Sequence, residues 1–275
     1  MTGFVDHTGG EISWRERPGA GPVLVALHGI GSEASSFDAL AGHLPRWRMI
    51  AWNAPGYAWS TPLRAHWPLA EDYAAALAGL VERLGLDHFH LLGHSLGTLI
   101  AASYAVFRPG HVLSLTLAAC AQGGGAAPEG DLPPAQAARL TELQRDGAAA
   151  FAAARAPRLI HEPEANPALV DAVAASMAKV RLPGYGQAVR MLASGDLAAD
   201  CARLTVLTAV IVGEGDIVTP PDQSARAHAA IPATMRRGFT QVQGAGHAIH
   251  LQAPQALAAM LLAQDQSTSS PLQQK

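Results

Sequence analysis

Residues 90–105 read HLLGHSLGTLIAASYA and contain the strongest structural signal in the chain. An apolar run ends at Gly93, a short polar stretch follows, and an alanine-rich segment with helical spacing begins at once. This order predicts a strand, a sharp turn and a helix, with Ser95 at the apex. Gly93 and Gly97 flank the serine because so tight a turn strains its backbone and leaves no room for neighbouring side chains.

Composition and charge are those of an ordinary globular protein. The 275 residues are 49% hydrophobic and 15% charged, enough for one large α/β core with an inserted subdomain. The net charge of −3 is spread out, and basic residues form no stripe with aromatics, which argues against nucleic acid as a partner. Without a signal segment or a run of roughly 20 apolar residues, we expect a cytoplasmic protein with no membrane partner.

The two cysteines, Cys120 and Cys201, provide neither a disulfide framework nor the spacing of a metal site. We interpret them as free buried thiols. We expect no metal and no cofactor, and a monomer and a homodimer are both compatible with the sequence.

Apolar runs alternate with helical segments along the chain. Strands are predicted at residues 23–27, 47–52, 88–92, 112–118, 206–212 and 237–242, after an edge hairpin of residues 4–7 and 11–16. Helices are predicted at residues 32–44, 69–85, 220–231 and 254–263, the third capped by Thr219 with Pro220 at its first position. Since parallel strands need crossovers, this alternation predicts an α/β fold, a mainly parallel sheet with helices on both faces.

The pattern changes between the sixth and seventh predicted strands. Glycines and prolines without periodicity are followed by short alanine-rich helices interrupted by prolines. We interpret residues 122–203 as a small helical lid inserted into a core of residues 1–121 and 204–265. The polar residues 266–275 are predicted to be a flexible tail.

A serine hydroxyl is a weak nucleophile until a base accepts its proton, so Ser95 needs a histidine and an acid. Ligands of such sheets lie beyond the carboxyl ends of the strands. Asp216 follows the strand ending near residue 212, and His247 follows the strand ending near residue 242. Their order, nucleophile, acid and base, predicts a catalytic triad of Ser95, Asp216 and His247.

Each member of this triad has an alternative. Asp216 could merely brace its loop, and Glu214 and Asp222 are weaker candidates for the acid because one precedes the glycine turn and the other falls inside a predicted helix. His250 is the rival base, although its position leads away from the site.

The oxyanion of acyl transfer needs two donors. The N–H of Leu96, at the start of a helix, is one, and the N–H of Ile30 in the loop of residues 28–31 is the other predicted donor. His28 is expected to hold this loop by hydrogen bonding, and His94 to point away from the nucleophile and pack.

Together these residues resemble the α/β-hydrolase fold superfamily, serine hydrolase branch, over almost the whole chain. The stretch Asn53-Ala54-Pro55-Gly56-Tyr57 with Ser60 is similar to a family loop that commonly ends Gly-x-Gly-x-Ser, with Ala58 in place of the second glycine. The second half resembles β-ketoadipate enol-lactone hydrolases and related esterases in three short stretches. These are Gly184-Tyr185, Asp196-Leu197 and residues 213–221.

The resemblance implies a serine hydrolase that cleaves a small carboxylic ester or lactone through an acyl-enzyme. One alternative is a carbon–carbon bond hydrolase of an aromatic ring-cleavage product, but those enzymes usually carry Trp after the catalytic histidine and Gly-Pro-Gly in the oxyanion loop. Here Ala248 and Gly31-Ser32-Glu33 stand instead. A non-turnover small-molecule receptor on the same fold is the other alternative.

Specificity is expected to come from the lid. Met177, Met191 and Leu192 are the predicted substrate contacts. The lid also contains arginines that could hold a substrate carboxylate, as an enol-lactone would require, and solvated helix faces explain them equally well. They are Arg155, Arg158, Arg181 and Arg190.

Overall fold

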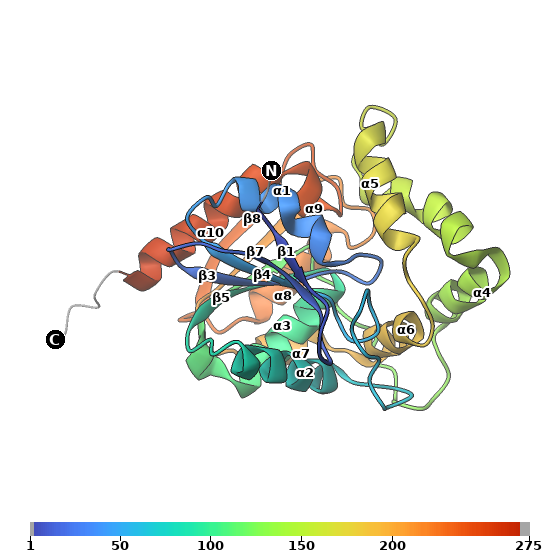
Figure 1. Ribbon diagram of the computed structural model, residues 1–275, viewed down its shortest axis with the longest axis horizontal. Helices are drawn as coiled ribbons and strands as arrows, with labels where there is room; N and C mark the ends of the chain where they lie inside the picture. Colours follow the sequence, from blue (N-terminus) through green and yellow to red (C-terminus); the bar gives the residue numbers. More distant parts are fainter. Residues whose placement is uncertain (1–2, 270–275) are drawn as a thin grey trace.

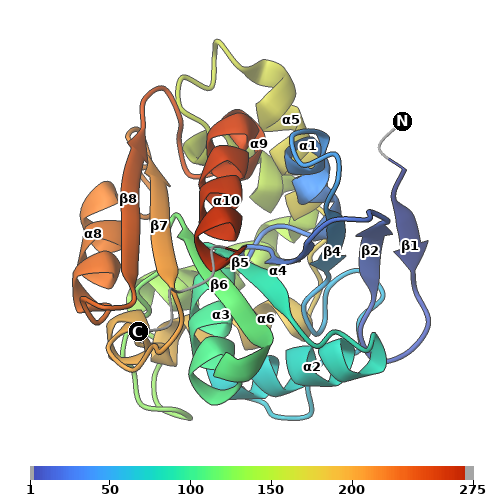
Figure 2. The same cartoon turned by 90° about the vertical axis from the view of Figure 1, so that its left-hand side faces the viewer.

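The computed structural model describes residues 3–269, which contain one eight-stranded sheet in the order β1-β2-β4-β3-β5-β6-β7-β8. Only the β1–β2 and β2–β4 pairs are antiparallel, so the predicted mainly parallel sheet with an N-terminal hairpin is confirmed (Figures 1 and 2). The strands are β1 (Val5–His7), β2 (Trp14–Arg17), β3 (Val23–Leu27), β4 (Arg48–Trp52), β5 (Phe89–His94), β6 (Val112–Ala118), β7 (Thr208–Gly213) and β8 (Arg236–Val242).

Helices cover both faces of the sheet. One face carries α1 (Asp38–Gly42), α9 (Ile249–Gln252) and α10 (Pro254–Ser269), and the other carries α2 (Ala70–Arg83), α3 (Leu96–Phe107) and α8 (Pro221–Ala230) (Figure 2). Neighbouring residues in the central strands therefore enter opposite cores. Leu92 packs on the α10 side and Leu91 on the α3 side. Burial on both faces explains why these strands read as continuous apolar runs.

The segment between β6 and β7 is helical, and its longer helices lie together on one side of the molecule (Figure 1). These are α4 (Pro134–Arg155), which is kinked at Gly147, α5 (Pro167–Met177) and α6 (Gly184–Ser194), and the short η3 (Ala156–Leu159) follows α4 directly. The last helix of the segment, α7 (Leu197–Cys201), packs instead against α3 and α8.

The chain just after α4 is fastened to the loop that follows β8. The N–H of Ala248 donates to the carbonyl of Leu159 at 2.8 Å. The Gln252 amide oxygen accepts from the N–H groups of His161 and Gly246 at 3.0 and 2.9 Å, and its NH₂ donates to the His161 carbonyl at 2.8 Å. Three of these hydrogen bonds join the two segments, and the bond from Gly246 holds Gln252 within its own segment.

Two sequence predictions need correction. Helix α8 begins at Pro221 with Pro220 at its N-cap position, so Thr219 is not the cap. The Thr219 hydroxyl donates instead to the Asp216 carboxylate. Helix α10 continues to Ser269, past the predicted end at residue 263 and through the beginning of the predicted tail of residues 266–275. Just before the tail, Gln264 is buried and donates to the Thr116 hydroxyl of β6 at 2.5 Å. Residues 270–275 lie outside the described residues.

Both cysteines are buried and unpaired, as predicted. Burial raises the pKa of Cys120 to about 12 and raises that of Cys201 as well, so neither thiol is a ready nucleophile. Within residues 3–269, no helix has the length and apolar character needed to cross a membrane.

The turn between β5 and α3 is held by backbone contacts that exclude side chains. A Cβ on Gly93 would lie 2.4 Å from the carbonyl oxygen of Gly97. A Cβ on Gly97 would lie 2.4 Å from the carbonyl oxygen of Leu27 in β3. The close approach expected from the sequence thus extends to a third segment.

We expect Gly97→Ala to lower the free energy of unfolding by about 1–3 kcal/mol, because backbone atoms must move to admit the methyl group. Gly79→Ala is the control, since Gly79 lies exposed in α2 with nothing within 4 Å of an added Cβ. It should stabilise by about 0.5–1 kcal/mol. Urea denaturation measures both, and equal effects of the two substitutions would contradict the packing argument.

Candidate active site

Ser95 lies at the carboxyl end of β5, immediately before α3. Its backbone has φ 53° and ψ −118°, a strained conformation for a residue with a side chain. The surrounding strands hold this conformation, and the Ser95 N–H donates to the carbonyl of Ala118 in β6 at 2.9 Å.

The structure brings His247 and Asp216 together with Ser95, from the loops after β8 and β7. His247 Nε2 lies 3.0 Å from the Ser95 hydroxyl, and His247 Nδ1 lies 2.9 Å from Asp216 Oδ2. Because an ionised carboxylate only accepts, Nδ1 carries the proton, and Nε2 is left to accept from the serine. This is the arrangement that activates a serine.

Asp216 is almost completely buried and well supplied with donors. Its Oδ1 accepts from the N–H groups of Val218 and Thr219 at 2.8 and 2.9 Å, and its Oδ2 accepts from the Thr219 hydroxyl at 2.8 Å. Burial acts to raise the pKa of Asp216, but attraction to His247 and the hydrogen bonds from His247 and Thr219 outweigh it, so this pKa lies below its ordinary value. The carboxylate therefore stays ionised at neutral pH.

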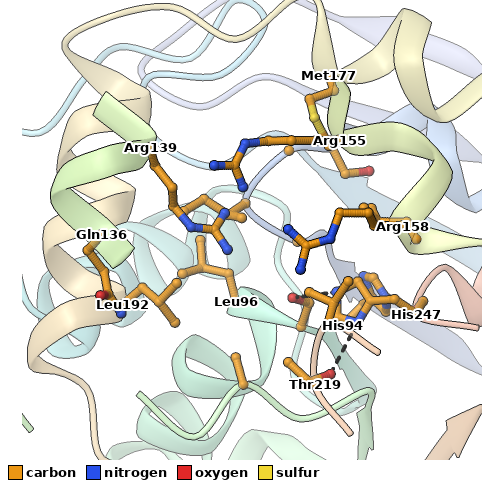
Figure 3. Close-up of a pocket in the computed structure, with 18 of the residues that line it drawn as sticks. His94, Leu96, Gln136, Arg139, Arg155, Arg158, Met177, Leu192, Thr219 and His247 are labelled. Atoms are coloured by element: carbon orange, nitrogen blue, oxygen red, sulfur yellow. Dashed lines mark hydrogen bonds between the residues drawn. The ribbon is translucent and has the colours of Figure 1, made fainter. Parts of the chain in front are cut away.

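Thr219 is a site residue that the sequence reasoning missed. Its hydroxyl donates to Asp216, and its oxygen lies 3.1 Å from His247 Nδ1 as a second acceptor for that N–H. Figure 3 shows this contact as the dashed line to His247. The signal was present in the spacing Asp-x-x-Thr, because an Asp side chain accepts from backbone N–H groups two and three residues later and folds the loop back.

The two predicted oxyanion donors lie at the same cavity as Ser95. Leu96 is the first residue of α3, so its N–H has no acceptor within the helix. The N–H of Ile30 donates to no described residue. The Tyr57 hydroxyl donates to the carbonyl of Ile30 at 2.6 Å and holds the next peptide, between Ile30 and Gly31.

His28 holds the loop of residues 28–31 by hydrogen bonding, as predicted. Its Nε2 accepts from the N–H of Ala54 at 3.0 Å, so its Nδ1 carries the proton and donates to the carbonyl of Gly29 at 2.8 Å. Complete burial lowers the pKa of His28 to about 4, which keeps the ring neutral.

The rival acids and the rival base do not contact Ser95. Glu214 is exposed, and Asp222 forms a surface ion pair with Arg226 at 2.6 Å. His250 is buried, and neither of its ring nitrogens has a partner among the described residues.

His94 is buried, but it does not point away from the site, and that part of the prediction was wrong. Its Nε2 donates to the carbonyl of His247 at 2.8 Å, and its ring packs 5.1 Å from that of His247 and 4.2 Å from that of His250. Burial lowers the pKa of His94 to about 3 and lowers that of His250 well below its ordinary value. A cluster of neutral imidazoles therefore supports the base.

A cavity of about 270 Å³ opens in front of Ser95 (Figure 3). Met177 and Leu192 lie in its wall, and their contact with a substrate stays a prediction. Met191 does not line it, because adjacent residues of α6 point in different directions, and Met191 is buried in the main core.

Three arginines line this cavity, two of them among those considered from the sequence. Arg155 and Arg158 line the wall, and Arg139 joins them from the first turns of α4. Arg139 was not among the arginines considered from the sequence. It lies on the same helix face as Gln136, three residues earlier, which also lines the cavity. The other two candidates are engaged elsewhere: Arg181 donates to the carbonyl of Ala58 and Arg190 to that of Gly186 at 3.0 Å.

Comparison with known proteins places this geometry in context. The profile of a family described as alpha/beta hydrolase fold matches residues 22–168. The 2-hydroxy-6-oxononadienedioate/2-hydroxy-6-oxononatrienedioate hydrolase 2 of Pseudomonas putida is 31% identical over 129 residues, 45% of this chain and 45% of that protein, less than two thirds of its length.

Two further proteins are similar over nearly their whole length. The magnesium-chelatase 30 kDa subunit of Rhodobacter capsulatus is 30% identical over 92% of this chain and 91% of its own. A solved structure, a thermophilic esterase from Thermogutta terrifontis, has a TM-score of 0.82 at 22% identity, covering 97% of this chain and 99% of its own, and shows the same fold.

Because several histidines are buried, we expect the free energy of unfolding to fall in acid. Their pKa values lie below the ordinary value of about 6.5, so below that pH the unfolded chain binds protons that the folded chain does not, and the free energy of unfolding falls. Each such histidine contributes at most about 1.4 kcal/mol per pH unit.

We expect His250→Leu to reduce this slope by about one proton between roughly pH 4.5 and 5.5, because it removes one of the buried rings. His88→Leu, which replaces an exposed histidine, is the control and should leave the slope nearer to that of the native protein. Denaturant unfolding at several pH values measures the slope. An unchanged slope in His250→Leu would show that His250 is not held neutral by the fold.

Proposed function

This chain belongs to the α/β-hydrolase fold family, and we propose that within it the protein is a serine hydrolase that cleaves a small carboxylic ester or lactone. One observation carries the proposal. Ser95, His247 and Asp216 form a continuous hydrogen-bonded chain, with heavy-atom distances of 3.0 and 2.9 Å, at the wall of a cavity. No cofactor is needed for this chemistry.

In the proposed mechanism, the Ser95 oxygen attacks the carbonyl carbon while His247 Nε2 takes the serine proton. Asp216 stabilises the resulting imidazolium, and the N–H groups of Ile30 and Leu96 bind the oxyanion. The tetrahedral intermediate then expels the alkoxide, which takes the proton from His247, and an acyl-enzyme remains. Water, deprotonated by the same histidine, attacks the acyl carbon and releases the acid and the serine.

Thr219 is proposed as a positioning residue in this mechanism. Its hydroxyl donates to the oxygen of Asp216 that faces His247, and it restricts the rotation of that carboxylate. The same hydroxyl oxygen can accept from the imidazolium. Both effects keep the base oriented towards Ser95.

The helical segment of residues 122–203 is proposed to act as a lid that selects the substrate. It supplies cavity-lining residues from four of its helices, α4, η3, α5 and α6, while the reacting groups follow strands β5, β7 and β8. Met177 of α5 and Leu192 of α6 are apolar contacts at this wall. A free small molecule, rather than a nucleic acid or a membrane, is the proposed partner.

A second candidate is carbon–carbon bond hydrolysis with the same triad. The match to the Pseudomonas putida dioate hydrolase favours it. The residues after His247 and in the oxyanion loop, Ala248 and residues 31–33, differ from the pattern usual in carbon–carbon hydrolases, so we rank it second.

A role without turnover is the remaining candidate. One relative that matches over most of the chain is named as a subunit of magnesium chelatase, and this name does not describe a hydrolysis. In that case the cavity would bind its ligand without cleaving it.

Labelling of Ser95 and an activity screen together distinguish these candidates, because labelling reports the reactive serine and the screen reports which bond is cleaved. A fluorophosphonate should form its adduct on Ser95, and Ser95→Ala should abolish both the adduct and the hydrolysis of short esters while the protein stays folded. Asp216→Asn should lower kcat by about 10⁴-fold if its effect equals that in the serine proteases. Mass spectrometry locates the adduct. Binding without turnover across esters, lactones and vinylogous diketones would favour the receptor role.

Thr219→Val should lower kcat about 10- to 100-fold, since it removes a hydrogen bond to a charged group, and should leave KM almost unchanged. Thr219→Ser keeps the hydroxyl and should restore most of the rate. Steady-state kinetics with a short ester measures both. Equal losses in the two variants would mean that packing of the methyl group, and not the hydroxyl, is what matters.

A further inference from the structure

We infer that the substrate carries an ionised oxyacid group, a carboxylate or a phosphate, apart from the bond that is cleaved, and that Arg139 and Arg158 bind it. The inference rests on the proposed function, because it names the substrate class of the same cavity. Three observations carry it: the charge of the cavity wall, the absence of protein partners for two of its arginines, and the direction in which these arginines point.

The cavity wall is cationic. Arg139, Arg155 and Arg158 line it, and no aspartate or glutamate belongs to its lining among residues 3–269. Polar neutral groups, such as the amides of Gln136 and Gln223, make up part of the remaining wall. A neutral ester would offer these positive charges no negative partner.

Arg155 is neutralised by the protein. It forms an ion pair with Glu142 of the same helix at 2.5 Å and lies over the ring of Phe151, 4.7 Å from its centroid. Its side chain is 18% exposed. These contacts hold the Arg155 side chain in place and give its charge a partner. The other two arginines of the wall, Arg139 and Arg158, remain to be considered.

Arg139 and Arg158 form no ion pair and no side-chain hydrogen bond with any of residues 3–269. Other arginines of the helical segment have partners: Arg145 binds Asp146, Arg181 binds Ala58, Arg190 binds Gly186 and Arg203 binds Asp200. In this segment, the unpartnered arginines are therefore those at the cavity.

The guanidinium groups of Arg139, Arg155 and Arg158 point towards the middle of the cavity (Figure 3). Like charges that converge repel one another, and because Arg139 is half-buried and Arg158 is exposed, water screens this repulsion only in part. An oxyanion between the two free groups removes this repulsion and accepts hydrogen bonds from both planar forks. A volume of about 270 Å³ limits the ligand to a small molecule.

The test compares esters of equal shape that differ in charge. Monoethyl succinate and ethyl 4-methylpentanoate differ by a carboxylate against an isopropyl group in the acyl half. Acetoxyacetate and isobutyl acetate differ in the same way in the alcohol half. We expect the native protein to prefer the anionic ester in at least one pair by kcat/KM, and to lose the preference as NaCl is raised from about 0.05 to 0.5 M.

Arg139→Met and Arg158→Met should each lower kcat/KM for the preferred anionic ester about 10- to 100-fold and change the neutral ester by less than about threefold. Arg145→Met is the matched control, because Arg145 lies on the same helix as Arg139 but is exposed and paired with Asp146. It should change neither. The rate of Ser95 labelling by a neutral fluorophosphonate should stay the same in all three variants.

Calorimetry with Ser95→Ala provides a readout that needs no turnover. Succinate or inorganic phosphate should bind, which identifies the oxyanion, and binding should weaken at least about tenfold when Arg139→Met or Arg158→Met is added. No binding of either ion, with equal rates in both ester pairs, overturns the inference, while Ser95 labelling still supports the proposed function. Ion binding to a protein whose Ser95 does not react overturns the proposed function instead and supports the anion site.

Discussion

The contact of three backbone segments around Ser95 is the constraint on which the site depends. The carbonyls of Gly97 and Leu27 occupy the space that side chains would take at Gly93 and Gly97. This contact pushes the serine into its positive φ and places the N–H of the next residue at a helix start, so the proposed nucleophile and a proposed oxyanion donor arise from one distortion. His247 and Asp216 then form their hydrogen bonds with a serine whose position is already fixed.

The site combines two electrostatic environments. Below the serine, His28, His94 and His250 are buried and neutral, and Asp216 keeps its charge only because His247 and Thr219 surround it. Above it, arginines from the helical segment make the wall positive. Deep burial suits the proton transfers, since it excludes competing water, while the positive wall suits recognition, since charge attracts a ligand from a distance.

The sheet could be predicted because each of its central strands shows a local sequence pattern, a short apolar run. Strand β6 was placed at residues 112–118, its observed bounds, since a strand covered on both faces must be apolar throughout. The positions of Asp216 and His247 followed from the rule that loops after strands meet at one edge. Thr219, Arg139 and Met191 escaped prediction because their roles depend on which way a side chain points across a tertiary contact, and a polar residue near a helix start suits a cap as well as a charge network.

The hydrogen bonds between the chain after α4 and the loop after β8 link a cavity-lining arginine, Arg158, to His247. Arg158 immediately precedes Leu159, whose carbonyl accepts from the N–H of Ala248, and Ala248 immediately follows His247. The backbone of Arg158 and that of His247 are thus linked by a few covalent bonds and one hydrogen bond. For the proposed substrate, this short link limits the distance between the anionic group and the bond that is cleaved, so the length of the molecule matters as well as its charge.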